Sequence, residues 1–386
     1  MPRLDLKPLH AQTMVITGAS SGIGLATARM AADRGARVVL VARDRDGLAR
    51  ICEDIRRDGG RADYIAADVG RRDEMRRVVE TTIERYGGFD TFFNNAGVGA
   101  YARLEEISDE DHERIFRTNY WGVVYGSTEA LKHLRRRGGA LINMGSISSE
   151  VHAPLLSAYT ASKFAVKGFT DSLRLELRHD DAPVSVTLIQ PSGIDTPFGT
   201  HAKNDMDVAS RVPPPVYAPE SVARAVLRAA EHPVRHIVIG GSGRAQIALA
   251  RLFPSLADVV FEKMFYATAR DPRRPPQGGR GFHRAGSSGA IHGEPTGYHA
   301  SSSLYTQAAL HPVASLAIGA TAAVAGLGLA AWLMAPERLP AQGRRGMPVR
   351  RDAPARRRPF DDEPRRPAPY EPRATTRPPE QYAPIR

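Results

Sequence analysis

Tyr159 and Lys163 are the residues whose types and spacing most directly suggest chemistry. They stand four residues apart in a stretch that should be helical, so both side chains lie on one face of the helix. A nearby ammonium group favours phenolate over phenol, which lowers the pKa of a tyrosine from its usual value of about 10. Such a tyrosine can give a proton to a carbonyl oxygen or take one from an alcohol. The pair by itself is a weak motif, because most such pairs are solvated neighbours on a helix surface.

A glycine-rich turn lies near the N-terminus, between a short apolar run and a helix-forming stretch. It reads Thr-Gly-Ala-Ser-Ser-Gly-Ile-Gly over residues 17–24. Gly18 permits a tight turn, Gly22 lets the backbone approach a pyrophosphate, and Gly24 lets the helix begin close to the strand. The helix N-terminus then offers free N–H groups and a positive dipole end to the phosphates. In this setting the turn predicts a dinucleotide-binding site.

Arg43, at the end of the second apolar run, indicates which dinucleotide binds. An acidic residue at this point would accept hydrogen bonds from the adenosine ribose of NAD. A guanidinium group instead suits the 2′-phosphate of NADP. The alternative is a solvated arginine that opens the next helix, and Asp44, one step later, weakens the distinction. Because no acid stands at the expected position, the sequence favours NADP(H) over NAD.

Ser146 and Asn119 complete a constellation that resembles the short-chain dehydrogenase/reductase family, in its short single-domain branch. Ser146 stands thirteen residues before Tyr159, just beyond an apolar run, and Asn119 lies in Thr-Asn-Tyr-Trp-Gly. A helix cap would explain the serine alone, and a turn the asparagine alone. All four residues in this order, together with the glycine spacing, carry the resemblance from the N-terminus to about residue 240.

The resemblance implies direct hydride transfer between NADP(H) and the carbon of a carbonyl or secondary alcohol, without a metal. Tyr159 would be the acid or base, and Ser146 would orient the substrate oxygen. Lys163 would tune Tyr159 and hold the nicotinamide ribose, while Asn119 would fix a water relay to Lys163. The alternative is a sensor or membrane-anchored scaffold that binds NADP(H) without turnover. The loss of a catalytic residue would favour that alternative, and all four are present.

The resemblance also implies a set of cofactor contacts. They are Gly18, Ser20, Ser21, Gly22, Ile23, Gly24, Arg43, Asp68, Val69, Asn95, Ala96, Gly97, Tyr159, Lys163, Ile194 and Thr196. Ser192 departs from the family pattern, which generally has glycine there, and we expect a local adjustment without loss of activity.

Seven short apolar runs, separated by helix-forming segments, indicate how these residues are positioned. The runs cover residues 14–16, 37–41, 62–67, 91–94, 140–144, 184–190 and 236–239. Strands that are apolar on both faces are typical of a parallel sheet covered by helices on both sides. We therefore expect an α/β fold with a doubly wound parallel sheet (a Rossmann fold), over a catalytic domain of residues 8–245.

The remaining residues differ in composition from this domain. We expect a helical extension at 246–270, then a flexible linker at 271–309 that is rich in Gly, Pro, Ser, Arg and His. The charge-free stretch 313–335 is long enough for one transmembrane helix or a membrane-associated helix. The alternative is a helix packed on the enzyme. The Arg/Pro-rich tail at 336–386 should be disordered.

These features suggest a cytoplasmic catalytic domain tethered to a membrane. Whether the tail is exported or lies beside anionic lipid stays open, because one span would place it against the positive-inside tendency. The net charge of +11 comes largely from arginine runs without a nucleic-acid motif, so we expect no nucleic-acid partner. Cys52 is the only cysteine, which excludes an intrachain disulfide.

The expected partners are a small carbonyl or alcohol substrate and, by resemblance, a second copy or three further copies of the chain. Helices around 105–137 and 159–178 would form the homodimer or homotetramer interface. Residues 98–104, 151–156 and 198–217 should shape the substrate pocket. Apolar residues in these segments suggest an apolar substrate, although a core or dimer contact explains them equally well.

Overall fold

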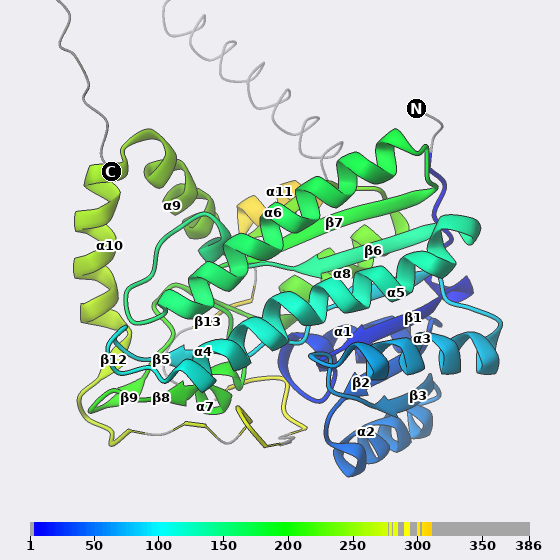
Figure 1. Ribbon diagram of the computed structural model, residues 1–386, viewed down its shortest axis with the longest axis horizontal. Coiled ribbons are helices and arrows are strands. Elements are labelled where there is room, and N and C mark those ends of the chain that lie inside the picture. Colours follow the sequence, from blue (N-terminus) through cyan, green and yellow to red (C-terminus); the bar gives the residue numbers. More distant parts are fainter. Residues whose placement is uncertain are drawn as a thin grey trace, which may run out of the picture. The chain divides into compact units, whose positions relative to one another are not determined.

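A seven-stranded parallel sheet forms the centre of the protein (Figure 1). The computed structural model describes residues 4–310 apart from 277, 280, 285–288, 294–298 and 302. The strands lie in the order β11-β7-β6-β4-β1-β2-β3, which confirms the doubly wound α/β fold. Their bounds are β1 Thr13–Thr17, β2 Arg37–Ala42, β3 Arg61–Ala66, β4 Thr91–Asn94, β6 Gly139–Met144, β7 Val184–Pro191 and β11 His236–Ile239.

Helices cover both faces of this sheet, and the alternation of buried side chains along β1 shows why. Met14 and Ile16 belong to the apolar cluster shared with α1, α2 and α8, whereas Val15 belongs to the cluster shared with α3, α5 and α6. Figure 1 shows α5 and α6 lying across one face. The helices are α1 Gly22–Asp33, α2 Arg45–Arg57, α3 Arg72–Tyr86, α5 Gly122–Arg137, α6 Ser157–His179 and α8 Pro219–Glu231.

Shorter elements gather around the ends of the strands. Three two-stranded ladders pair β5 with β8, β9 with β12 and β10 with β13. The strands are β5 Ala100–Tyr101, β8 Lys203–Asn204, β9 Ala209–Ser210, β10 Val216–Tyr217, β12 Arg270–Asp271 and β13 His299–Ala300. The helical elements are η1 Leu9–Ala11, α4 Asp109–Phe116, η2 Arg117–Trp121, η3 Ile147–Ser149, α7 Phe198–His201, α9 Gly241–Leu252, α10 Pro254–Thr268 and α11 Leu304–Leu310.

The described residues beyond α10 pack on the domain, which differs from the flexible linker expected at 271–309. Phe282 is buried in an apolar cluster with Ile115, and Leu310 belongs to the cluster that the sheet shares with α1, α2 and α8. The Thr306 hydroxyl accepts a hydrogen bond from the Gly240 N–H at 3.0 Å. Composition alone suggested a flexible linker, but a few buried side chains and backbone hydrogen bonds suffice to hold a polar, glycine-rich segment in place.

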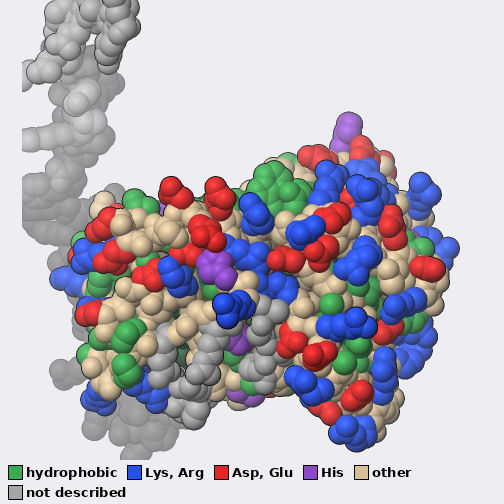
Figure 2. All heavy atoms as spheres, turned by 60° about the horizontal axis from the view of Figure 1, so that its bottom comes forward, with side chains coloured by type: hydrophobic (Ala, Val, Ile, Leu, Met, Phe, Trp, Pro, Cys, Tyr) green, Lys and Arg blue, Asp and Glu red, His purple; other side chains and the backbone are tan. Residues whose placement is uncertain are grey.

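The predicted membrane segment 313–335 and the tail 336–386 lie outside the described residues. Within the described part of the chain, no helix combines the length and apolar character that crossing a membrane requires. The membrane segment therefore stays a prediction. On the face shown in Figure 2, basic and acidic side chains are intermixed over the described surface.

Candidate active site

The glycine-rich turn between β1 and α1 has the close packing that its sequence predicts. Gly18 has φ +64°, and a Cβ there would lie 2.7 Å from the Ala96 Cα. A Cβ on Gly24 would lie 2.3 Å from the Gly18 carbonyl oxygen. Helix α1 begins at Gly22, so its first N–H groups lack partners within the helix. The turn thus fits the phosphates of a dinucleotide, as the motif predicts.

A cavity of about 340 Å³ lies beside this turn and joins the predicted cofactor and catalytic residues. Every predicted site residue except Gly24 and Asn119 lines it. Those that do are Gly18, Ser20, Ser21, Gly22, Ile23, Arg43, Asp68, Val69, Asn95, Ala96, Gly97, Ser146, Tyr159, Lys163, Ile194 and Thr196. Gly24 instead packs on Gly18 behind the turn. The volume is in the range of sites that enclose a small molecule.

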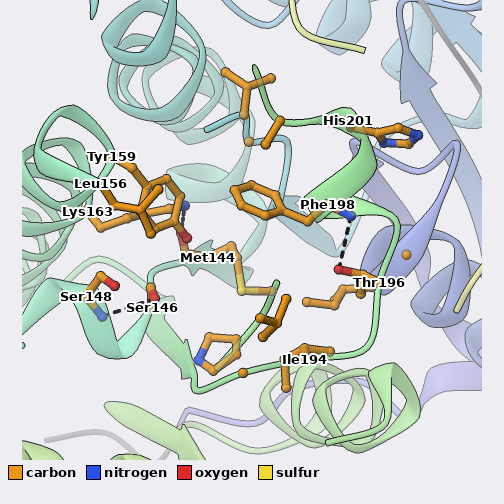
Figure 3. A pocket seen from close by; sticks show the side chains of 18 of the residues that line it. Met144, Ser146, Ser148, Leu156, Tyr159, Lys163, Ile194, Thr196, Phe198 and His201 are labelled. Carbon is orange, nitrogen blue, oxygen red and sulfur yellow. Dashed lines mark hydrogen bonds between the residues drawn. The ribbon is translucent and has the colours of Figure 1, made fainter. Parts of the chain in front are cut away.

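Three catalytic candidates meet in this cavity, as Figure 3 shows. Tyr159 and Lys163 lie on α6, and the Lys163 Nζ stands 5.7 Å from the centre of the Tyr159 ring. The Lys163 residue is 3% exposed, and its ammonium group donates a hydrogen bond to the Met144 carbonyl oxygen at 2.9 Å. The Ser146 hydroxyl lies near the Tyr159 phenol and acts to lower its pKa. This arrangement can hold a carbonyl oxygen between a phenol and a hydroxyl.

The protonation of this pair differs from the sequence-based expectation. Burial raises the pKa of Tyr159 to about 12, although the Ser146 hydroxyl acts in the opposite direction. Burial also lowers the pKa of Lys163 to about 8. We expected the ammonium group to lower the tyrosine pKa, but it lies over the ring while desolvation acts on the phenol itself. The phenol is therefore protonated at neutral pH and can act as a proton donor.

Ser146 combines a structural role with the position expected for catalysis. Its hydroxyl accepts a hydrogen bond from the Ser148 N–H at 3.1 Å and caps the 3₁₀ helix η3. The cap fixes the hydroxyl at the end of β6, facing Tyr159. The capping explanation considered from the sequence is thus correct, and it is the means by which this hydroxyl is oriented.

Asn119 is fully buried and lies in the π-helical turn η2. Its side-chain amide donates to the Val98 carbonyl oxygen and to the Ser162 hydroxyl, each at 3.0 Å, and accepts from the Val98 N–H at 2.8 Å. These bonds hold the backbone next to Gly97, which lines the cavity. Asn119 is therefore a positioning residue in this structure, and its predicted water relay to Lys163 stays a prediction.

Charged residues line the end of the cavity where the adenosine of a dinucleotide is expected, and the sequence predicted only some of them. The Arg43 guanidinium donates to backbone carbonyl oxygens of residues 281–284, with 3.1 Å to His283 and to Arg284. Asp68 pairs with Arg114 at 3.0 Å. Although burial raises it, the pKa of Asp68 is lowered overall by the Gly70 N–H and by Arg114. No motif marks Arg114, because only the tertiary fold brings it to Asp68.

The segment after β7 carries the predicted nicotinamide contacts and accommodates Ser192. Ile194 is bridged to Tyr217, and the Thr196 hydroxyl accepts a hydrogen bond from the Phe198 N–H at 3.4 Å. The Ser192 hydroxyl donates to the Ile239 carbonyl oxygen at 2.8 Å. A Cβ on Gly240 would lie 2.4 Å from the Ser192 Oγ, so the facing glycine makes room for this serine.

An apolar wall completes the cavity on the substrate side. Tyr101, Leu156 and Phe198 come from the three segments expected to shape the pocket. Helix α10 adds Phe261, Met264 and Phe265, which the sequence placed in a separate extension. Its apolar periodicity was visible, but the residue pattern does not show which cavity a helix faces.

The described residues contain no group of three or more His, Cys, Asp or Glu side chains placed to hold a metal ion. Cys52 lies on the buried face of α2, and burial raises the pKa of its thiol to about 12.

Comparison with known proteins shows the family to which the chain is similar. Residues 12–207 match the short chain dehydrogenase family. The chain is 42% identical over 337 residues to the uncharacterized oxidoreductase YxnA of Bacillus subtilis (strain 168), covering 86% of this chain and 93% of that protein. It is 33% identical over 276 residues to 11-beta-hydroxysteroid dehydrogenase A of Sesamum indicum, covering 68% of this chain and 78% of that protein.

A solved structure shows the same fold. It is a short chain dehydrogenase/reductase from Burkholderia phymatum in complex with NAD, with a TM-score of 0.59 and 25% identity. The likeness covers 66% of this chain and 96% of that one. From the family match, the relatives and the fold, the chain belongs to the short-chain dehydrogenase/reductase family of oxidoreductases, which use a nicotinamide dinucleotide.

Proposed function

We propose that this oxidoreductase interconverts a carbonyl and a secondary alcohol on an apolar substrate, with NADP(H) as its cofactor. The observation that carries the proposal is the meeting of Tyr159, Ser146 and Lys163 in a cavity that is continuous with the glycine-rich turn. The residues present fit a dinucleotide, since glycines and helix N–H groups face the cavity. When bound, the nicotinamide would supply or accept the hydride.

The side chains of the site then handle the proton and the substrate oxygen. The Tyr159 phenol, which burial keeps protonated, donates its proton to the carbonyl oxygen during reduction. Ser146 holds that oxygen beside the phenol. Lys163 holds the cofactor ribose and compensates the negative charge that develops on Tyr159 as its proton leaves. In the oxidative direction the proton returns from the alcohol to Tyr159.

Two observations at the adenosine end support NADP(H) over NAD. Arg43 lines the cavity and carries donors that suit a 2′-phosphate, which would take the place of the carbonyl oxygens of residues 281–284 that these donors now bind. Asp44, the acid that would serve a ribose, uses its Oδ1 to accept the Gly47 N–H at 3.1 Å as the N-cap of α2. A carboxylate engaged in a helix cap is a poorer partner for ribose hydroxyls.

The substrate proposal rests on the apolar wall of α10 and on one relative. Phe261, Met264 and Phe265 line the same cavity as Tyr159, and such apolar side chains suit an apolar substrate with a polar tip. The relative from Sesamum indicum is named as an 11-beta-hydroxysteroid dehydrogenase. We include ketosteroids and hydroxysteroids among the candidate substrates for this reason.

The cofactor test compares hydride transfer with NADPH and with NADH, using a panel of aldehydes, ketones and ketosteroids. Arg43→Ala should raise the KM for NADPH about 10- to 100-fold and leave the KM for NADH within about threefold, because only NADPH loses a charge-assisted bidentate contact. Equal losses for both cofactors would contradict the NADP(H) assignment.

We also propose that the catalytic domain is cytoplasmic and is held at a membrane by residues 313–335. We further propose that the chain assembles into a homodimer or homotetramer. The charge-free length of 313–335 supports the first. Membrane fractionation of the full chain and of a chain lacking 313–335 tests it, and an unchanged distribution would contradict it. Light scattering of the purified protein tests the second, and a monomer would contradict it.

A further inference from the structure

The chain returns to the cofactor groove after α10, in segments shown in yellow in Figure 1. We call the described residues 281–284 and 289–293 the strap. One end is anchored by Phe282, which is 1% exposed, and by a 2.7 Å contact between the His283 Nε2 and the Asp111 Oδ1. There the backbone carbonyl oxygens of 281–284 accept hydrogen bonds from both terminal nitrogens of Arg43. The donors proposed for the 2′-phosphate are thus bound to the protein itself.

The other end of the strap lies on the glycine-rich turn. The Ala290 carbonyl oxygen accepts a hydrogen bond from the Gly22 N–H at 2.9 Å. Gly22 is the first residue of α1, so this N–H is one of the donors that a helix N-terminus offers to phosphate. A diphosphate that uses this donor must replace the carbonyl oxygen. Arg43 and the Gly22 N–H, the two groups expected to bind phosphate, therefore both donate hydrogen bonds to carbonyl oxygens of the strap.

His292 holds this end of the strap in place. Its Nδ1 lies 3.0 Å from the Asp195 Oδ2, and its Nε2 lies 2.9 Å from the Glu220 Oε1. The Gly293 N–H donates to the other Asp195 oxygen at 3.1 Å. A neutral imidazole can donate from only one nitrogen, so two carboxylate contacts favour the imidazolium form. His292 thereby ties the strap to the segment before Thr196 and to α8.

We propose that the strap is an internal competitor for the phosphate groups of the dinucleotide, and that His292 is the positioning residue that sets cofactor affinity. The inference rests on the proposed function, because it takes this groove to be the cofactor site. Carbonyl oxygens and phosphate oxygens are both acceptors and need the same donors. Cofactor binding at Arg43 and Gly22 must therefore displace the strap, and whatever holds the strap weakens binding.

We call the contacts of His292 with Asp195 and Glu220 the latch. The strength of the latch depends on pH, and the direction of this dependence follows from the groups around His292. The charged groups around His292 are Asp195 and Glu220, and Arg211, Asp271 and Arg274 line a small cavity with Asp195 and Gly293. Although burial lowers it, the pKa of His292 is raised overall by its contacts with Asp195 and Glu220. The latch is therefore complete below the unfolded value of about 6.5 and is lost as pH rises through the higher folded value. Cofactor affinity should increase over that interval.

The test measures the dissociation constants of NADPH and NADH by dihydronicotinamide fluorescence, on the full chain without substrate. His292→Gln and Glu220→Gln should each tighten binding about three- to tenfold at pH 6, as expected for half-exposed charge-assisted contacts. The gain from His292→Gln should shrink as pH rises above 6, because the wild-type imidazolium loses its proton and with it one of its two carboxylate contacts. His232→Gln is the matched control, since His232 is exposed at the opposite end of α8 and should bind like wild type.

Hydrogen exchange gives a second readout that does not depend on turnover. Peptides covering 281–284 and 289–293 should exchange faster when NADPH is bound, because the strap is displaced. Weaker or unchanged NADPH binding in His292→Gln and Glu220→Gln would overturn the inference. Slower hydrogen exchange of the strap with NADPH bound would also overturn it, because the strap would then close over the cofactor. If neither dinucleotide binds to any variant, the proposed function fails and the strap inference falls with it.

Discussion

At the scale of one residue, Lys163 lowers the stability of the folded protein by placing a charged group in a buried site. Its ammonium group is almost completely buried and donates to the Met144 carbonyl oxygen. Burial disfavours the charged form, which is why its pKa falls to about 8. A lysine in this position destabilises the folded state as long as it must carry a proton there. In the proposed function, Lys163 offers its charge to Tyr159 and to the cofactor, which would account for a buried lysine here.

Lys163→Met should therefore abolish turnover while raising the free energy of unfolding at pH 7 by about 1–3 kcal/mol. The folded lysine releases its proton near pH 8, and the unfolded one near about 10.4. Wild-type stability consequently rises with pH across this interval, and the advantage of the variant should shrink over the same range. Urea unfolding at several pH values measures both effects. A variant that is less stable than wild type at pH 7 would contradict this explanation.

The proximity of the candidate catalytic residues was predictable at this scale, whereas their protonation was not. Tyr159 and Lys163 are close in sequence on one helix, so their neighbourhood follows from helical geometry alone. The direction of the Tyr159 pKa depends on burial by residues from α10 and the 198–217 loop, which no local pattern reveals. The same holds for Arg114, which reaches Asp68 only through the tertiary fold.

At the scale of elements, the glycine-rich turn and the strand ends position the cofactor site. All seven predicted apolar runs are strands of the central sheet, with bounds that agree to within one residue at each end. Prediction succeeded because buried parallel strands are apolar on both faces and leave a continuous signal. The two-residue strands β5, β8, β9 and β10 were not predicted, since their pairing depends on distant segments.

Gly24 provides the test of this element. Gly24→Ala should lower the free energy of unfolding by about 2 kcal/mol or more and weaken dinucleotide binding, because its Cβ would lie 2.3 Å from the Gly18 carbonyl oxygen. Gly168→Ala is the matched control, since Gly168 lies in α6 with nothing within 4 Å of its added Cβ. It should stabilise the protein by about 0.5–1 kcal/mol. Thermal unfolding with and without NADPH separates the two, and similar behaviour of both variants would contradict the packing role of Gly24.

At the scale of the whole described molecule, the described residues between α10 and Leu310 pack on the catalytic domain. Their composition predicted a flexible linker, yet Phe282 and Leu310 are buried and β13 pairs with β10. Average composition is a poor guide here, because the contacts are made by single residues separated by polar stretches. The limits of the folded unit therefore could not be predicted from the sequence, although the limits of the sheet could.

Two truncated chains test this extent. A chain ending after Leu310 should unfold at a denaturant concentration close to that of the full chain, whereas one ending at Arg270 should lose several kcal/mol of stability, on the order of a buried phenylalanine or more. Phe282→Ala in the full chain isolates one of these contacts and should cost about 3 kcal/mol. Equal stability of the two truncated chains would show that residues 271–310 contribute nothing to the fold.

The central claim is that the Tyr159 phenol transfers the proton in an NADP(H)-dependent reaction, and one comparison tests it most directly. Turnover with NADPH and the best substrate of the panel is measured for wild type, Tyr159→Phe and the matched control Tyr120→Phe, whose hydroxyl lies outside the cavity lining. NADPH binding is measured in parallel. We predict that Tyr159→Phe lowers kcat about 100- to 10,000-fold with nearly unchanged NADPH binding, while Tyr120→Phe stays close to wild type. Turnover that survives in Tyr159→Phe would contradict the account.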